Sequence, residues 1–208
     1  MKRSFYAHPV FAVAVVLMIA WALPALAATD QAPTGTYKAT TGSTAATASG
    51  AGAAAGAAAA GGAAGASGAT KGYDVTMNIS GYSGDEEIEE LKALVKDPAA
   101  FLKTLNGFRH GSVKLGNKSV PINAAYSIKQ GGKYHIFLLS AKSFDKSASR
   151  IQAKGSGAAA GYIRLTVDGA GDGGGMMYAT AQVVFKVSGE IVARAGASTA
   201  TKLNEVHR

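Results

Sequence analysis

The stretch from residue 28 to residue 72 constrains the fold of this chain more than any other sequence feature. It consists mainly of Ala, Gly, Ser and Thr, and its charged residues are Asp30, Lys38 and Lys71. Such small side chains bury little apolar surface, and each Gly inside a helix costs about 0.8–1 kcal/mol relative to Ala. We therefore predict a disordered linker over residues 28–72 and a single domain over residues 73–208.

The N-terminus has the pattern of an export signal. Lys2 and Arg3 precede an apolar run over residues 10–23, and Pro24 is followed by the small residues of an Ala-Leu-Ala triplet. This run is shorter than the roughly 20 residues that span a bilayer. We predict that residues 1–27 are a cleaved signal peptide and that the protein is exported, either to the periplasm or out of the cell. An uncleaved N-terminal membrane anchor is the alternative.

Composition excludes several kinds of chemistry. The chain has no cysteine, which rules out disulfides, thiolate metal ligands and cysteine nucleophiles. Its 21 Lys and Arg against 13 Asp and Glu give a net charge of +8, a mild excess that suits an anionic partner. Nucleic acid is not the predicted partner, because the protein is expected to be exported and the first predicted helix is strongly acidic.

Two helices are predicted near the start of the domain. Residues 73–80 alternate apolar and polar side chains, as a strand with one buried face does. Ser83 is followed three residues later by Glu86 and then by apolar residues at helical spacing, which predicts a capping box and an amphipathic helix. Asp97 and Pro98 have the pattern of an N-cap and first position of a second helix, ending at Asn106-Gly107.

After Phe108 the pattern changes to strands joined by short turns. Gly116-Asn117 and Gly131-Gly132 each separate two strand-like runs, and further hairpins are expected around residues 168–175 and at Ser188-Gly189. Strands joined by such short turns are antiparallel. The predicted class is α+β: two short N-terminal helices followed by an antiparallel sheet of hairpins, either open or closed into a partial barrel.

One basic stripe is a candidate binding site. The cations recur every four residues, at Lys142, Lys146, Arg150 and Lys154, while Phe144 and other apolar residues follow a second stripe. If this segment is a helix, the cations form one face that attracts an anionic envelope surface, such as phosphorylated lipid or glycan. A merely solubilising helix face is the alternative, and so is an irregular loop.

Catalytic and cofactor patterns are weaker. Ser143 and Lys146 satisfy S-x-x-K, but the companion motifs of that hydrolase class are absent. The letters G-x-G-x-x-G occur over residues 169–174, yet a strand is expected next where a nucleotide site needs a helix. Asp168 and Asp172 lack the other ligands of a standard calcium loop. The histidines after the signal region show no metal-site spacing; they are His110, His135 and His207.

Several stretches resemble a family of uncharacterised exported bacterial domains. They read FLKTL at 101–105, HGSV at 110–113, PINAA at 121–125, IRLTVD at 163–168 and LNEVHR at 203–208. The last stretch departs from the family's pattern at Glu205 and His207. No activity is associated with that family, so the resemblance implies export and a single domain, and nothing further.

The functional prediction is an exported, non-catalytic interaction module, without metal or cofactor, that contacts an anionic envelope surface or another envelope protein. Two alternatives stay open. One is a carrier that holds an apolar ligand in the domain interior, lined by Phe137, Leu139, Tyr162, Met177 and Phe185. The other is a serine hydrolase that uses Ser143 and Lys146.

Overall fold

The computed structural model describes residues 30–42, 72–145, 149–151, 157–194 and 200–208. Its helices are α1 (Asp85–Ala93) and α2 (Pro98–Leu105). Its strands are β1 (Gly35–Gly42), β2 (Asp74–Ile79), β3 (Gly111–Leu115), β4 (Lys118–Ile122), β5 (Ala124–Gln130), β6 (Lys133–Ser140), β7 (Ala159–Val167), β8 (Gly173–Phe185), β9 (Ile191–Ala193) and β10 (Ala200–His207).

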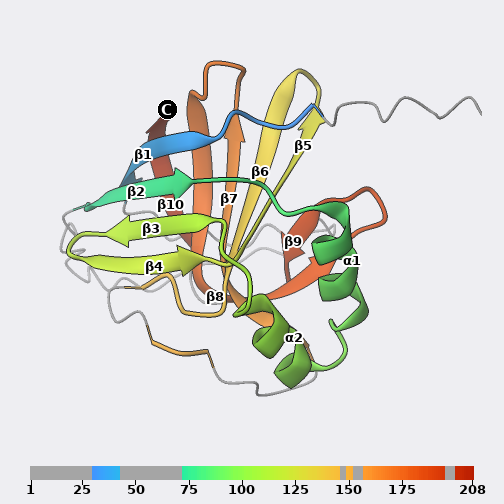
Figure 1. The fold of residues 1–208 in the computed structure, drawn as a ribbon. Helices are drawn as coiled ribbons and strands as arrows, with labels where there is room; N and C mark the ends of the chain where they lie inside the picture. Colours follow the sequence, from blue (N-terminus) through green and yellow to red (C-terminus); the bar gives the residue numbers. More distant parts are fainter. Residues whose placement is uncertain (1–29, 43–71, 146–148, 152–156, 195–199) are drawn as a thin grey trace, which may run out of the picture.

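The strands form one antiparallel sheet that nearly closes into a barrel. Its order is β4-β3-β2-β1-β10-β8-β7-β6-β5, with β9 paired to β8 (Figure 1). The two edge strands, β4 and β5, follow each other in the chain with Asn123 alone between them, and β4 also contacts β6. A closed or nearly closed sheet leaves few strand edges open to other chains.

The α+β class predicted from the sequence is wrong. Strands make up 54% of the described residues and helices 12%, and the helices follow β2 instead of opening the fold. The reason is that the two ends of the folded chain contribute strands that the sequence analysis did not identify. β1 pairs with β10, and together they join β2 to β8 in the middle of the sheet.

Strand β1 lies inside the range 28–72 that was predicted to be a linker, so this part of the range belongs to the sheet. Its inward residues Tyr37, Ala39 and Thr41 are buried and alternate with exposed Lys38 and Thr40. The Tyr37 ring supplies the large buried surface that the small residues around it lack, and its hydroxyl donates to the carbonyl of Pro33 at 2.6 Å.

The residues just before β1 cover the open edge of β5. Asp30 accepts hydrogen bonds from Lys129 and from the Tyr134 hydroxyl, and the amide of Ala32 donates to Ser127 Oγ. Further along β5, the backbone of Ser83 pairs with Ala125, and Ser83 Oγ accepts from the Ala125 amide. The capping box expected at Ser83 is therefore wrong: α1 has Gly84 as its N-cap, and Ser83 instead pairs with the sheet.

The second helix and two of the hairpins agree with the sequence. The Asp97 carboxylate accepts from the amides of Ala99 and Ala100, and Pro98 is the first residue of α2. Gly116-Asn117 joins β3 to β4 and Gly131-Gly132 joins β5 to β6, with positive φ at Gly116, Gly131 and Gly132. These signals act over a few neighbouring residues, and no distant contact overrides them at these positions.

Two hydrophobic clusters hold the fold together, one on each face of β6. Ile136 and Leu138 point into the barrel. They pack there with buried residues from all the other strands except β9, and Met177 is the residue that β8 contributes. Phe137 and Leu139 point outward into a second cluster that α1, α2 and β9 cover, with Leu91 and Phe101 contributed by the helices. β6 is therefore apolar from Ile136 to Leu139, the part of the strand that is buried on both faces.

Asn123 fixes the corner where β4 turns into β5. Its side chain is fully buried, donates to the Phe108 carbonyl at 2.9 Å and accepts from the Ala141 amide at 2.9 Å. Buried polar groups of this kind need partners to offset their loss of water. Asn123 thus ties the segment after α2 and the segment after β6 to the same corner.

Candidate functional site

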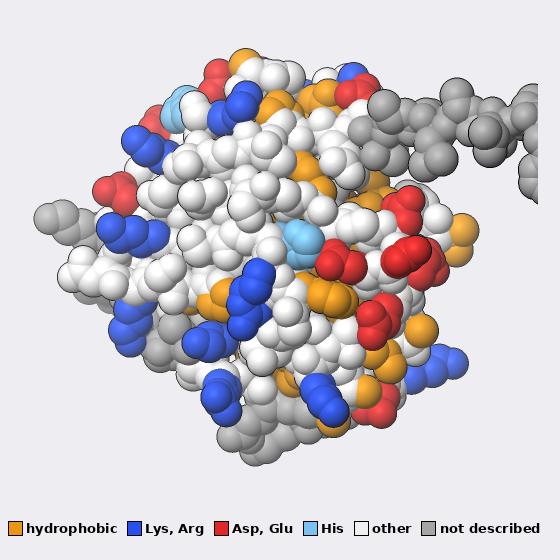
Figure 2. Space-filling model, in the orientation of Figure 1, with side chains coloured by type: hydrophobic (Ala, Val, Ile, Leu, Met, Phe, Trp, Pro, Cys, Tyr) orange, Lys and Arg blue, Asp and Glu red, His pale blue; other side chains and the backbone are white. Residues whose placement is uncertain are grey.

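Charge is unevenly distributed over the surface. In Figure 2, Lys and Arg side chains are spread over the face formed by β1–β4 and α2, whereas Asp and Glu gather over α1 and also lie along the upper and left edges of the view. We define the cationic face as Lys38 on β1, Lys103 on α2, Arg109 just before β3 and Lys114 on β3, all exposed. Asp74 on β2 is an acidic neighbour within this region.

The strand register brings two of these cations to one side of the sheet. Lys38 and Lys114 are both aligned with Thr76 of the intervening strand β2. Strands lie about 4.8 Å apart, so the two Cα atoms are separated by roughly 10 Å. Arg109 donates to the backbone carbonyls of Asn106 and Phe108, which orients its guanidinium beside the end of α2. Within the described residues, no ion pair engages any member of the cationic face.

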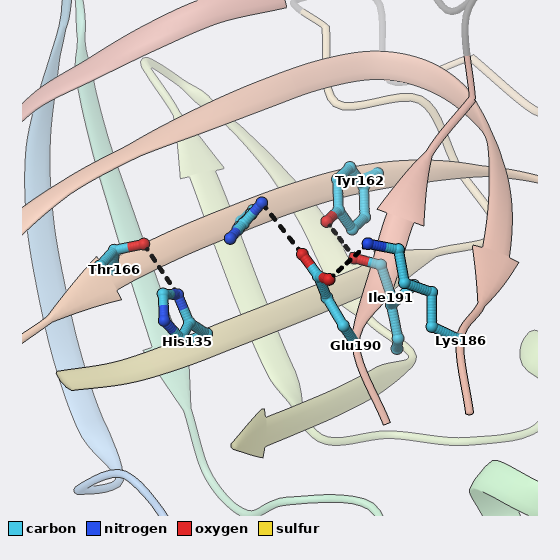
Figure 3. Close-up of polar contacts among 7 residues, drawn as sticks. His135, Tyr162, Thr166, Lys186, Glu190 and Ile191 are labelled. Carbon is cyan, nitrogen blue, oxygen red and sulfur yellow. Dashed lines mark hydrogen bonds and ion pairs between the residues drawn. The ribbon is translucent and has the colours of Figure 1, made fainter. Parts of the chain in front are cut away.

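A second polar group lies on the outer face of β6 and β7, where the β8–β9 hairpin folds over the sheet (Figure 3). Glu190 forms ion pairs with Lys186 at 2.7 Å and Arg164 at 3.3 Å. The Lys186 hydrogen bond, aided by the charge of Arg164, lowers the pKa of Glu190. The Tyr162 hydroxyl donates to the Ile191 carbonyl at 2.6 Å, so the β9 end of the β8–β9 turn is fastened to β7.

His135 lies beside this group. Its Nδ1 is 3.1 Å from the Thr166 hydroxyl, and burial together with the Arg164 guanidinium lowers its pKa below the ordinary value. Thr166 and Arg164 also line an open groove of about 510 Å³ along Gly173–Gly175. Arg164, Lys186 and Glu190 are paired with one another, and these contacts hold the hairpin in place.

The basic stripe predicted from the sequence does not form a helix face in the part of it that the structure describes. Lys142 and Arg150 face each other across an isolated antiparallel bridge, and the Ser143 amide donates to the Ser149 carbonyl. Lys146 and Lys154 lie outside the described residues. The anion contact proposed for these four residues stays a prediction, without the helix on which it was based.

The Ser143 side chain forms hydrogen bonds that join its loop to β8. It is 4% exposed, and its hydroxyl lies 2.9 Å from the Ala179 carbonyl and 3.0 Å from Asp145 Oδ2. Residues 143–145 are not helical, so the one-turn spacing that S-x-x-K requires is not set up there. The proposed partner Lys146 lies outside the described residues.

The five residues suggested to line an apolar interior are split between two clusters. Met177 packs inside the barrel, whereas the others belong to the outer cluster beneath the helices: Phe137, Leu139, Tyr162 and Phe185. Four of the five are almost fully buried, and each packs against other side chains of its cluster. Phe185 is partly exposed at the end of β8, where an apolar groove opens.

The candidate metal ligands serve other purposes. Asp168 Oδ1 accepts from the amides of Ala170, Gly171 and Asp172, which lowers its pKa and shapes the β7–β8 turn. Asp172 lies 2.9 Å from Nδ1 of His207, and His110 Nε2 lies 2.9 Å from Glu87 Oε2 without the alignment of a hydrogen bond. Among the described residues no group of three or more potential ligands converges.

The glycines over residues 169–175 differ from the expected turn. Only Gly171 has a positive φ, whereas Gly173–Gly175 belong to β8 and pair with β7. Strand β8 therefore begins at Gly173, within the G-x-G-x-x-G sequence itself. No helix N-terminus is present at this point to bind a pyrophosphate.

Comparison with known proteins finds no family model, no curated protein and no solved structure that matches this chain. The resemblance to exported bacterial domains therefore stays a prediction and adds no support to any function. None of the helices in the described ranges is long and apolar enough to cross a membrane.

Sequence reasoning missed the cationic face. Its residues come from separate elements and are far apart in the chain, with Lys38 in a stretch expected to be a linker. The alternation of Lys38 and Thr40 with Tyr37 and Ala39 is the signal that could have identified β1. Which strands would lie beside it could not be read from the sequence, because the register of β1 with β2 and β10 depends on the closed sheet.

Proposed function

We propose that the protein is an exported, non-catalytic binding module whose cationic face contacts a phosphate-bearing surface of the cell envelope. The observation that carries this proposal is the separation of charge, with the cationic face on β1–β4 and α2 and the carboxylates over α1. The export-signal pattern of residues 1–27 is consistent with this location.

Electrostatics favour this role for the cationic face over a purely solubilising one. Each Lys or Arg near an anionic membrane contributes about 1 kcal/mol of attraction, so four such charges are enough for weak, reversible binding. The acidic α1 is repelled by the same surface, so the molecule is oriented as well as attracted. Outside this face, the polar groups at the β8–β9 turn, at Ser143 and at the β7–β8 turn are engaged in ion pairs and hydrogen bonds.

The test is sedimentation of the full chain with vesicles that contain phosphatidylglycerol. Lys38→Glu with Lys114→Glu changes the net charge by four units and should weaken binding by more than about tenfold. The matched control is Lys133→Glu with Arg194→Glu, which makes the same change at exposed positions outside the cationic face. Wild type and variants share the N-terminal segment, so its affinity for lipid cancels in the comparison.

Binding to the anionic vesicles should fall steeply between low and physiological salt and should be absent from vesicles of phosphatidylcholine alone. An equal loss in both double variants would contradict the proposal, because it would show a response to net charge without a defined face. Wild-type binding that does not depend on salt would also contradict it.

A further inference from the structure

A groove between the end of α1 and the end of β8 has the chemistry of a ligand site. It encloses about 440 Å³, within the range of about 300–1,000 Å³ typical of small-molecule sites. Its apolar lining comes from two elements that meet there: Ala93 and Val95 from the α1 side, and Val184, Phe185 and Val187 from the β8 side.

Val187 is the unusual member of this lining. It is fully exposed, although the chain has just left a strand whose neighbouring residues pack into the outer cluster. Together with the neighbouring apolar residues of the lining, its side chain forms a contiguous apolar patch, and covering such a patch removes apolar surface from water. The Tyr162 and Glu190 contacts hold this hairpin in place, so the exposed position of Val187 is part of a fastened structure.

The polar lining has a single sign of charge. The groove is lined by Lys92, Lys96 and Lys186, and its described lining contains no carboxylate. Lys92 and Lys186 each have a carboxylate partner, Glu89 and Glu190, whereas no ion pair of Lys96 is formed within the described residues. An anionic group in the groove can therefore pair with Lys96 without displacing a carboxylate, with two further ammonium groups within the same lining.

We infer that this groove binds an anionic amphiphile, a single alkyl or acyl chain with a carboxylate or phosphate headgroup. The chain would cover Val187 and Val95, and the headgroup would pair with Lys96 at the rim. This site is separate from the cationic face, and its occupant is a single molecule and not a membrane surface. The inference therefore stands or fails independently of the proposed function.

The experiment is calorimetric titration of the full chain with dodecanoate and with lysophosphatidylglycerol, each below its micelle-forming concentration. Both carry an alkyl chain and an anion, and they differ in whether the anion is a carboxylate or a phosphate. Dodecyl maltoside supplies the same alkyl chain without charge. We expect saturable binding of at least one anionic probe, and of the maltoside much more weakly.

Two variants locate the site. Val187→Asp should weaken binding by about tenfold or more, the factor expected from the loss of one buried valine contact, and Lys96→Glu should weaken it severalfold. The matched control is Ser188→Asp, which places the same charge on the neighbouring exposed residue without removing apolar surface. Lys38→Glu with Lys114→Glu should leave the binding unchanged.

These positions are exposed, so thermal unfolding should confirm that each variant keeps its fold, and Val187→Ser provides an uncharged second test at the tip. The inference is overturned if neither anionic probe binds, or if the maltoside binds as tightly. It is also overturned if Val187→Asp and Ser188→Asp have equal effects. Two further results would assign the groove to a different partner and so overturn the inference. One is binding only to intact anionic vesicles, and the other is displacement of the probe by polyglutamate alone.

Discussion

The glycines at the start of β8 allow a matched test of the fold. A Cβ added to Gly175 would lie 2.5 Å from the Arg164 carbonyl oxygen and 2.7 Å from Leu165 Cδ2. One added to Gly174, the adjacent residue, would have its nearest neighbour at 3.5 Å, an ordinary van der Waals distance. Neither glycine has a positive φ, so the difference between them is one of space and not of backbone conformation.

We expect Gly175→Ala to destabilise the protein by about 1–3 kcal/mol, the usual cost of forcing extra volume into a packed interior. Gly174→Ala should be neutral or slightly stabilising, because the added methyl group meets no clash and lowers the entropy of the unfolded chain. This effect raises the free energy of unfolding by up to about 0.4–1 kcal/mol. For a folded body of this size, each kcal/mol shifts the melting temperature by about 2–4 °C.

The assay is urea and thermal unfolding of both variants beside the wild type, followed by circular dichroism. A difference of about 2–16 °C in melting temperature between the variants, with Gly175→Ala the lower, agrees with the structure. If the two substitutions have the same effect, Gly173–Gly175 is a loop, as the sequence suggested, and the placement of β8 between β7 and β10 is wrong.

Three further predictions concern single positions. Asn123→Ala should cost about 2 kcal/mol in urea unfolding, since it leaves the partly buried Phe108 carbonyl and Ala141 amide without their partner. Glu205 has a φ of +48° at a bulge in β10, so Glu205→Gly should raise stability by up to about 1 kcal/mol, and a loss would refute the strained geometry. In an NMR titration, His135 should titrate below its ordinary pKa of about 6.5; Arg164→Gln should raise that pKa and Glu190→Gln should lower it. Because the folded-state pKa is the lower one, this histidine should reduce stability as the pH falls through about 6.5, and a His135 pKa above that value would contradict the burial.

Local signals predicted their own structures well. Asp97 and Pro98 start α2 as expected, because a cap depends on residues within one turn of each other. The turn glycines between β3 and β4 and between β5 and β6 likewise act over two residues. At Ser83 the same type of signal failed, because the hydroxyl is placed against the Ala125 amide, 42 residues away, and is not available to cap α1.

Long-range pairing could not be predicted. β1 lies in a segment of small residues and becomes a strand because β10, at the other end of the chain, and β2 supply its hydrogen-bond partners. The predicted α+β class was wrong for this reason, since the sequence analysis counted the helices but missed the two strands that join the halves of the sheet. The cationic face depends on the same pairing, because Lys38 and Lys114 share a side only through the register of β1, β2 and β3.

The most direct test of the proposed binding role is an NMR map of the chain with polyphosphate, which carries the anionic groups without an alkyl chain. Amide shifts should be largest around Lys38 and Lys114, should decrease as salt is added, and should be small at residues 184–187 of the groove. Shifts centred on Lys142 and Arg150, or no shifts at low salt, would contradict the assignment of β1–β4 as the contact surface.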